Sequence, residues 1–329
     1  MILKQSQAKL PIWPDAVRGG PNALLRSAFF AGIHSKKRRV IGVQASPDLE
    51  PEGVIVAAQD GVMLKYAGTQ LNQYDADVFF EVLHRSRRER LGAEALFHGY
   101  SFLQAIGRDD SRSSYQDLNN SLRRLRRGTI DVRWTASHRP YEYVGSLIAD
   151  YTRETETKAY HVMLSPKILT LFAPSSWTQI EWDERMKLKS RPLALWLHSY
   201  FSTHARPFPV STAFLKEKTG SPTKLLKHFR VELKVALHAM QETIGWTAVW
   251  DADLVTVMRL PSGSQSRHIS RVEQQTKVIE AAKAANERLR QAAPRSPGRQ
   301  ATNLQQKSSD RRRTESILRT MFDQGPELR

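Results

Sequence analysis

Basic side chains recur at helical spacing in two stretches of this sequence, and their types are those that bind DNA. The stretch 221–245 places these residues off its apolar stripe: Thr223, Lys224, Lys227, Arg230 and Lys234. The stretch 114–128 does the same with Asn119, Asn120, Arg123, Arg124, Arg126 and Arg127. Lysine and arginine bond guanine in the major groove, asparagine bonds adenine, and threonine meets the methyl group of thymine. The pattern predicts two helices that contact double-stranded DNA.

The helix expected at 221–245 is the better candidate for reading bases. Its inward stripe is formed by Leu226, Phe229, Leu233, Leu237, Met240 and Ile244. We expect the helix to begin at Ser221, as its cap, with Pro222 at the first position. Thr223 and Lys224 would then lie in the N-terminal turns, with which groove-reading helices contact base edges.

The helix expected at 114–128 carries its four arginines near the C-terminal end. There they suit phosphate contact better than base reading, or they simply complement the helix dipole. Asn119 and Asn120 leave a base-reading role open. A solvated charged face is the alternative for either helix, but the pattern occurs twice on a chain of net charge +17, which favours DNA binding.

Each basic helix runs into a pair of expected strands, at 129–134 and 141–148 and again at 246–250 and 254–260. A groove-entering helix followed by a two-stranded wing is the winged variant of the helix-turn-helix. Further helices are expected at 22–33, 74–90, 99–107, 165–172, 182–204 and 211–220, and a further strand at 160–164. The expected fold class is α+β, mainly α, with two tandem winged-helix domains and a basic C-terminal tail.

Composition shifts along the chain give the expected domain limits. They are an N-terminal arm at 1–20, a first winged-helix domain at 21–175, a second at 176–262 and a tail at 263–329. From residue 261 the chain holds 14 Lys and Arg against 7 Asp and Glu and few large apolar residues. We expect the tail to be mostly disordered or marginally helical, with possible helices at 272–291 and 311–322.

Charge and residue usage narrow the classes of partner. A pI near 10.2 indicates a polyanion: nucleic acid first, and an acidic membrane surface second. No apolar run approaches the roughly 18 residues that would span a bilayer, and the N-terminus lacks the features of a secretory signal. The chain has no cysteine, which excludes disulfides and thiolate chemistry. We expect a cytoplasmic, bacterial protein without cofactor or metal.

Each feature of the sequence that resembles a catalytic motif has a simpler structural explanation. His84 to Arg87 superficially matches an element of tyrosine recombinases, but a solvated basic helix end explains it more simply. Two acidic clusters, Asp75 with Asp77 and the 181–184 stretch, are explained by acids near helix N-termini. There is no nucleotide-binding loop and no HExxH motif. The chain is therefore not expected to be an enzyme.

Seven blocks of the sequence, in order, resemble the TrfA family of plasmid replication initiators. They are LPIWPDAVRGGPNALLRSAFF (10–30), GTQLNQYDADVFFEVLHRSR (68–87) with the preceding QDG turn, YVGSLI (143–148), LSPKILTLF (164–172), PLALWLHSYFSTHARPFPV (192–210), KHFRVELKVAL (227–237) and PSGSQSRH (261–268). The resemblance covers most of the chain from residue 10 to 268.

This resemblance implies a function as well as a fold. It implies specific binding to repeated origin sites (iterons), opening of an adjacent AT-rich region with possible binding of its single strands, and plasmid or nucleoid association. It further implies recruitment of the host initiator, the replicative helicase and the sliding clamp, together with monomer–dimer exchange through the first domain. The competing interpretation is a repressor of similar fold that binds a palindromic operator and opens nothing.

Family initiators can carry a clamp-binding peptide with a glutamine, a spaced leucine and an aromatic residue. Gln7, Leu10, Ile12 and Trp13 have these ingredients at altered spacing. The alternative is that the three apolar side chains pack the N-terminal arm onto the first domain.

Overall fold

The structure, a computed structural model, describes residues 9–42, 54–56, 61–90, 92–136, 139–173 and 175–292. The chain divides into one compact unit, Met1–Leu260, and a second unit that begins at Pro261. The first unit contains two hydrophobic cores, one built from residues between Leu10 and Trp182 and the other from residues between Leu188 and Val257. We call the parts around these cores the first lobe and the second lobe.

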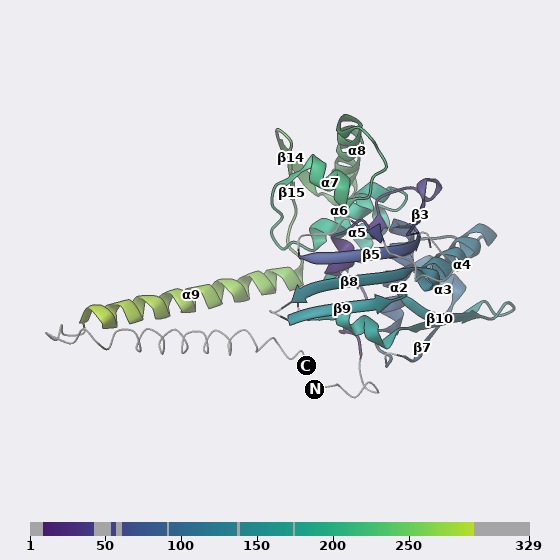
Figure 1. Ribbon diagram of the computed structural model, residues 1–329, viewed down its shortest axis with the longest axis horizontal. Helices are drawn as coiled ribbons and strands as arrows, with labels where there is room; N and C mark the ends of the chain where they lie inside the picture. Colours follow the sequence, from purple (N-terminus) through teal and green to yellow (C-terminus); the bar gives the residue numbers. More distant parts are fainter. Residues whose placement is uncertain are drawn as a thin grey trace. The chain divides into compact units, whose positions relative to one another are not determined.

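The two lobes share one order of elements, helix, strand, helix, basic helix and two strands (Figure 1). In the first lobe these are α2 (Gln73–Ser86), β7 (Glu94–His98), α3 (Gly99–Ala105), α4 (Arg112–Arg127), β10 (Ile148–Arg153) and β11 (Ala159–Leu164). In the second lobe they are α6 (Pro192–Ser202), β13 (Val210–Ser211), α7 (Thr212–Lys218), α8 (Leu226–Ile244), β14 (Thr247–Asp251) and β15 (Leu254–Met258).

Strand pairing makes the correspondence complete. In both lobes the last strand lies between its hairpin partner and the early strand, in the orders β10-β11-β7 and β14-β15-β13. All these pairs are antiparallel. A three-stranded sheet behind a helix-turn-helix is the winged-helix arrangement, and the expected fold class of two such units is confirmed.

The wing of the first lobe is not the hairpin that we expected from the sequence. Strands β8 (Thr129–Ala136) and β9 (Arg139–Gly145) do pair, so that hairpin is confirmed. However, β8 also pairs with β5 (Val62–Thr69), in a separate sheet with β3 (Val40–Ile41) and β4 (Val54–Ile55). The wing is the next hairpin, β10–β11. Only one strand of this second hairpin, at 160–164, was expected from the sequence, and its pairing with β7 joins residues distant in the sequence.

Two helices differ from their expected lengths. The helix expected at 22–33 is only α1 (Asn22–Leu25), after which the chain enters β2 (Phe30–Ala31), parallel to β6 (Leu71–Asn72). The apolar side chains that suggested a longer helix, Leu24, Leu25, Phe29 and Ile33, are nevertheless buried. The buried side chains of this short helix, the following turn and the strand have the same spacing along the sequence as the buried face of one long helix.

The helix expected at 182–204 is two helices, α5 (Trp182–Lys187) and α6. Pro192 begins α6 at its first helical position, where its missing N–H has no intrahelical partner to lose. The segment expected as a helix at 165–172 is the 3₁₀ helix η3 (Pro166–Phe172), and the Ser165 side chain does not cap it. A second 3₁₀ helix, η2, covers Ser35–Lys37.

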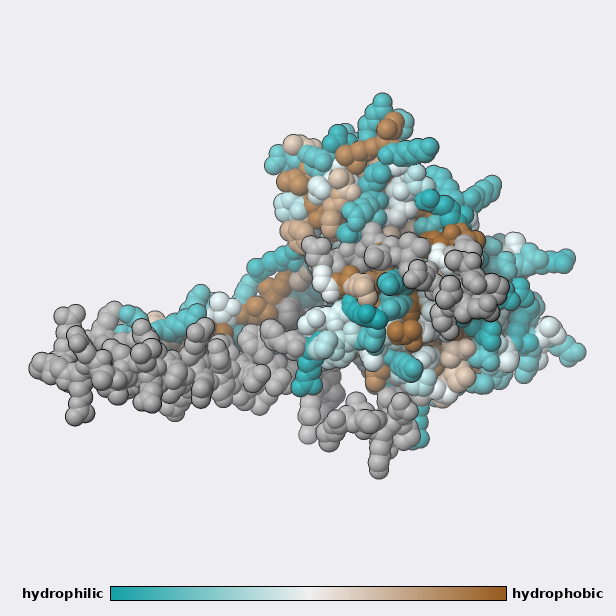
Figure 2. All heavy atoms as spheres, in the orientation of Figure 1, coloured by the Kyte–Doolittle hydropathy of each residue, from teal (hydrophilic) through white to brown (hydrophobic). Residues whose placement is uncertain are grey.

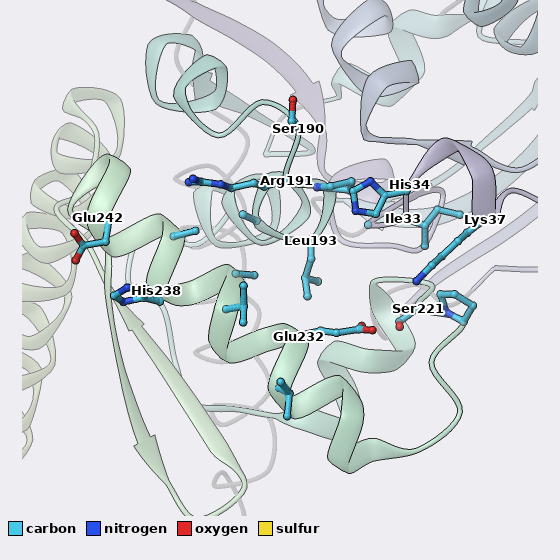
Figure 3. A pocket seen from close by; sticks show the side chains of 18 residues that line it. Ile33, His34, Lys37, Ser190, Arg191, Leu193, Ser221, Glu232, His238 and Glu242 are labelled. Atoms are coloured by element: carbon cyan, nitrogen blue, oxygen red, sulfur yellow. The ribbon is translucent and has the colours of Figure 1, made fainter.

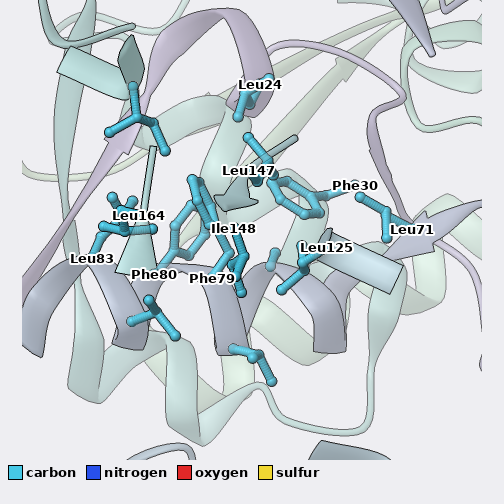
Figure 4. Close-up of a cluster of buried hydrophobic side chains, with 14 of the residues drawn as sticks. Leu24, Phe30, Leu71, Phe79, Phe80, Leu83, Leu125, Leu147, Ile148 and Leu164 are labelled. Carbon is cyan, nitrogen blue, oxygen red and sulfur yellow. The ribbon is translucent and has the colours of Figure 1, made fainter. Parts of the chain in front are cut away.

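The core of the first lobe packs around α2 (Figure 4). Phe79 and Phe80 lie against Phe30, with ring centroids 5.9 Å apart in each pair. A capping box starts α2: the Asn72 side chain accepts from the backbone of Tyr74 and Asp75, and Asp75 accepts from the Asn72 N–H. The helix expected at 74–90 is thus confirmed. Its capping residue Asp75 is also the carboxylate that Arg124 of α4 contacts.

The first core begins earlier and ends later than the expected domain limits. Leu10 and Trp13 belong to it, although they lie in the expected N-terminal arm. Strand β1 (Val17–Pro21) pairs with β12 (Trp177–Glu181), which holds the segment after residue 175 on the first lobe. The cores change between Trp182 and Leu188.

Buried hydrogen bonds join the two lobes. Arg185 is fully buried between them and donates to Asp77 (2.6 Å), to Gln73 and to Ser199 of α6. The Trp196 indole donates to the backbone oxygen of Ser27 (3.0 Å). These polar groups are shielded from water and mutually satisfied, so the two lobes are held in one relative position.

The second unit contains helix α9 (Gly263–Ala292). This helix starts well before residue 272, where the sequence predicted a helix to begin. Its start is capped by two reciprocal hydrogen bonds, because the Ser262 N–H donates to the Gln265 side chain and the Gln265 N–H donates to the Ser262 hydroxyl. The possible helix at 311–322 lies outside the described residues.

Candidate nucleic-acid interface

Helix α8 presents one apolar and one basic face, as expected. Phe229, Leu233 and Met240 are fully buried. Gly245 follows the helix with φ +74°, the left-handed conformation that ends helices and that glycine adopts without strain. The face turned away from the core carries exposed Lys227, Arg230 and Lys234.

The start of α8 differs from the expected one. The helix begins at Leu226, without a side-chain cap, so Ser221 is not its cap and Pro222 is not its first residue. Thr223 and Lys224 lie in the segment before the helix, and Thr223 donates its hydroxyl proton to Glu232 (2.9 Å). A Ser-Pro pair resembles a helix start, but here it lies in the turn between α7 and α8.

The cations of α8 divide into exposed and engaged side chains. Lys227 is exposed and, within the described residues, forms no ion pair. Arg230 donates twice to Asp253 at the turn of the wing (3.1 and 2.5 Å). Lys234 lies 5.5 Å from the ring centroid of Trp250, also in the wing. The wing thus orients two of the three cations.

Helix α4 matches its expected pattern. Tyr115, Leu118, Leu122 and Leu125 are buried beneath it. Of the residues predicted to contact DNA, those that are exposed are Asn120, Arg123, Arg126 and Arg127. Arg126 pairs with Asp150 of β10 (3.0 Å), as Arg230 pairs with Asp253 in the second lobe. In both lobes one arginine ties the basic helix to its wing.

Two residues of α4 that were expected to point outward are engaged inside the lobe. Arg124 donates to the buried carboxylate of Asp75 (2.7 Å), which also accepts from Ser121 and Arg38. Asn119 is half-buried and accepts a hydrogen bond from the Tyr160 hydroxyl (3.0 Å). Asn119 and Arg124 lie at the edge of the apolar stripe of α4. At such positions the sequence alone does not show whether a side chain points to solvent or into the lobe. These two residues support the fold of α4.

Several surface residues near α8 escaped the sequence analysis. Val231 and Val235 are 62 % and 65 % exposed on the outward face. Lys36, Lys37 and Arg39, in and just after η2, are also exposed. The signal was present: two valines outside the apolar stripe at a spacing of four, and the basic cluster SKKRR at 35–39.

The N-terminal peptide is engaged by the first lobe. Leu10 and Trp13 are 2 % and 1 % exposed, whereas Ile12 is 70 % exposed and Gln7 lies outside the described residues. The Trp13 indole donates to Nδ1 of His84 (3.1 Å) and stacks on Phe172. Leu10 and Trp13 therefore pack on the first lobe, which favours the packing interpretation for these two side chains, while clamp binding stays a prediction.

Ionisable groups here serve packing and ion pairing. Burial, helped by Arg18 and Arg87, lowers the pKa of His84 to about 3, so the ring is neutral and accepts from Trp13. Among the described residues, no group of three or more His, Asp or Glu side chains is arranged to hold a metal ion. In that same part of the chain, no helix is long and apolar enough to cross a membrane.

The chain is similar to several known proteins. The chain is 25 % identical over 233 residues to the plasmid replication initiator protein TrfA of Escherichia coli, a match covering 70 % of this chain and 58 % of that protein. Domains 2 and 3 of RctB align over 66 % of this chain and 94 % of theirs, with 11 % identity and a TM-score of 0.47. The Pi initiator protein, solved in complex with iteron DNA, aligns over 60 % of this chain and 97 % of its own, with 13 % identity and a TM-score of 0.43.

The family assignment rests on the match along the chain itself. Residues 3–259 match the TrfA protein family, and this range includes both lobes with their basic helices and wings. The chain is a member of the TrfA family.

Proposed function

We propose that this protein is a plasmid replication initiator that binds repeated sites in double-stranded origin DNA and is not an enzyme. The observation that carries the proposal is the duplicated unit of basic helix plus wing, in which exposed Lys227 and exposed Arg123 and Arg127 point away from two separate cores. Family membership over both units supports the same function.

In this proposal α8 is the main reader of sequence. Lys227 and Lys234 reach base edges, and Arg230 is held by Asp253 at the position where the wing meets the helix. Lys224 and Thr223, just before the helix, contact the adjoining phosphates or base edges. Together they read the main half of each repeat.

Helix α4 holds the backbone of the adjoining half. Arg123, Arg126 and Arg127 are exposed along one side, and Asn120 offers an amide to a base or a phosphate. The lobes are locked together through Arg185, so a duplex that contacts both helices must adapt to the protein. Such bending or untwisting costs least at flexible AT-rich steps, which favours opening there.

The wider activity is proposed from family membership. The protein would promote opening of an AT-rich region, contact its single strands, exchange between monomer and dimer through the first lobe, and recruit the host initiator, helicase and clamp. It would act in the bacterial cytoplasm at the plasmid. The chain spans 58 % of the length of the curated relative, so each of these activities requires its own test.

DNase I footprinting on the native plasmid origin tests the proposal. The expected result is protection of several directly repeated sites of about 20 bp beside an AT-rich segment. The Lys227→Ala variant should require a higher protein concentration for this protection, whereas Lys167→Ala, which changes an exposed lysine outside both basic helices, should protect as the wild type does. A single protected inverted repeat would instead support the repressor interpretation, and absence of protection by the wild type would contradict DNA recognition.

A further inference from the structure

The outward face of α8 contains apolar side chains that the fold does not use. Lys227, Val231, Lys234 and His238 follow one another at spacings of three and four, and Val235 lies four positions after Val231. These five residues share a face opposite the buried stripe. Single exposed apolar residues are common. Val231 and Val235, however, lie one turn apart on the outward face, and both stay exposed, so their apolar side chains add little to the stability of the fold. Such a pair points to contact with a partner.

Both valines line a groove of about 700 Å³ (Figure 3). The first-lobe segment at His34 and Lys37 forms the facing rim, together with Arg191 at the connection between α5 and α6. In the space-filling view, brown apolar and teal polar residues lie side by side over the α8 lobe (Figure 2). The groove therefore combines an apolar wall on α8 with positive charge at Lys37 on the facing rim and at Arg191, which donates to the Thr243 hydroxyl of α8 (2.9 Å).

Two carboxylates, Glu232 and Glu242, also line the groove, and within the described residues neither forms an ion pair with Lys37 or Arg191. Glu232 accepts the hydroxyl proton of Thr223, so its charge is partly satisfied within the second lobe. Glu242 lies in the last turn of α8, beyond His238. The positive rim at Lys37 and Arg191 thus remains suitable for a phosphate.

We propose that this groove receives one strand of the duplex, with Val231 and Val235 against thymine methyl groups and with Lys37 and Arg191 on the flanking phosphates. The inference rests on the proposed function and makes it specific. The thymine 5-methyl is the one apolar group that the major groove displays, and a valine on a groove-reading helix is its natural contact. The two valines would then recognise thymines by apolar contact alone, at base pairs next to those that Lys227 contacts by hydrogen bonding.

The methyl groups are tested by DNA in which only they are missing. An origin fragment is synthesised with deoxyuridine in place of thymidine, and its affinity is compared with that of the ordinary fragment by gel shift. Wild-type protein should bind the uracil fragment about fourfold more weakly for each methyl group contacted.

The valine variants show whether the loss belongs to these residues. Val231→Ala and Val235→Ala should each bind ordinary DNA more weakly and lose part of the discrimination between thymine and uracil. Val144→Ala is the matched control, because Val144 is 51 % exposed on β9, outside both basic helices, and this variant should keep full discrimination.

Two outcomes would overturn the inference and leave the proposed function intact. One is equal wild-type affinity for both fragments while repeats are still footprinted. The other is weaker binding by the valine variants with an unchanged ratio of thymine to uracil affinity, which would place the valines against another protein or in the fold. Failure of the wild type to protect any origin site would contradict the proposed function itself.

The phosphate half of the inference has a separate readout. Lys37→Ala and Arg191→Ala should each reduce the slope of log affinity against log salt by about 0.9, the value for one phosphate contact, without changing discrimination between thymine and uracil. Lys167→Ala should leave the slope unchanged. If the slope of log affinity against log salt in both rim variants equals that of the wild type, DNA phosphates do not bind at Lys37 and Arg191, and the proposal that a DNA strand lies in this groove is wrong.

Discussion

Lys227 combines the features of a base-reading side chain. It lies in the first turn of α8, is exposed, and forms no ion pair within the described part of the chain. Arg230 and Lys234, by contrast, are partly engaged by Asp253 and Trp250 of the wing. Sequence reasoning treated these cations as equivalent because helical spacing shows which side chains leave the core but not which of them meet a neighbour.

Lys227→Ala should relax discrimination among repeat variants by about 1–3 kcal/mol, because alanine cannot donate to the guanine acceptors at one position of the repeat. Competition binding with single-base variants of the repeat measures this. If affinity falls equally for every sequence, Lys227 contacts a phosphate and not a base.

His84 gives the fold a dependence on pH. Its pKa is about 3 in the folded protein and 6.5 without the fold's influence, so below pH 6.5 the unfolded chain binds a proton that the folded chain does not. Its contribution is therefore complete above pH 6.5 and is lost as pH falls toward 3, by up to about 1.4 kcal/mol per pH unit. Burial likewise lowers the pKa of His204 to about 4, which acts in the same direction.

Urea unfolding of the wild type and of His84→Asn, between pH 7.5 and 5, checks this contribution. Asparagine offers an acceptor near the position of Nδ1 but does not titrate. The wild type should lose more stability on acidification than the variant. A difference between the two proteins that stays constant with pH would contradict a neutral buried His84.

At the scale of elements, α4 and α8 are equivalent in position but not in charge distribution. Each follows a short helix and precedes a wing to which one arginine is tied. In α4 three of the four exposed arginines, Arg123, Arg126 and Arg127, lie in the C-terminal half, and the fourth, Arg112, lies at the first position. In α8 exposed Lys227 lies in the first turn and forms no ion pair within the described residues. This difference supports backbone contact by α4 and base reading by α8.

Replacing Arg123, Arg126 and Arg127 of α4 by alanine should flatten the salt dependence of binding and leave sequence preference intact. Removing one arginine from a phosphate reduces the slope of log affinity against log salt by about 0.9, so the three replacements together should reduce it by nearly 3. Gel shifts at several salt concentrations measure the slope, with Lys167→Ala as the control. Relaxed preference among repeat variants would show that α4 also reads bases.

Helix faces could be predicted from the sequence, whereas strand partners could not. The 3.6-residue period of Leu118, Leu122 and Leu125, or of Phe229 and Leu233, is a local property, and their burial was as expected. Whether β7 pairs with β9 or β11 depends on residues more than 50 positions apart. Arg124 escaped for the same reason, because its partner Asp75 is distant in sequence.

At the scale of the whole molecule, the buried contacts of Arg185 decide how the lobes are held. Its guanidinium meets Asp77 and Gln73 of α2 on one side and Ser199 and the Leu195 backbone of α6 on the other. The sequence analysis assigned no role to Arg185, because its partners on α2 are more than 100 residues away in the sequence. Helix α5 directly follows β12, which pairs with β1 of the first lobe, and the break before Pro192 separates α5 from α6.

Arg185→Leu should lower the free energy of unfolding by about 3–5 kcal/mol, because it leaves the Asp77 carboxylate buried without its partner. Replacing both residues with leucine should recover part of that loss. Denaturant unfolding measures the two values. If the single variant is as stable as the wild type, the link between the lobes does not depend on this pair.

Hydroxyl-radical footprinting of a single repeat tests the central claim most directly, namely that both basic helices contact one duplex. The wild type should protect two adjacent patches of backbone. Replacement of Arg123, Arg126 and Arg127 should remove one patch, and Lys227→Ala should weaken the other. A single patch that disappears with the α8 change and is untouched by the α4 changes would contradict the account.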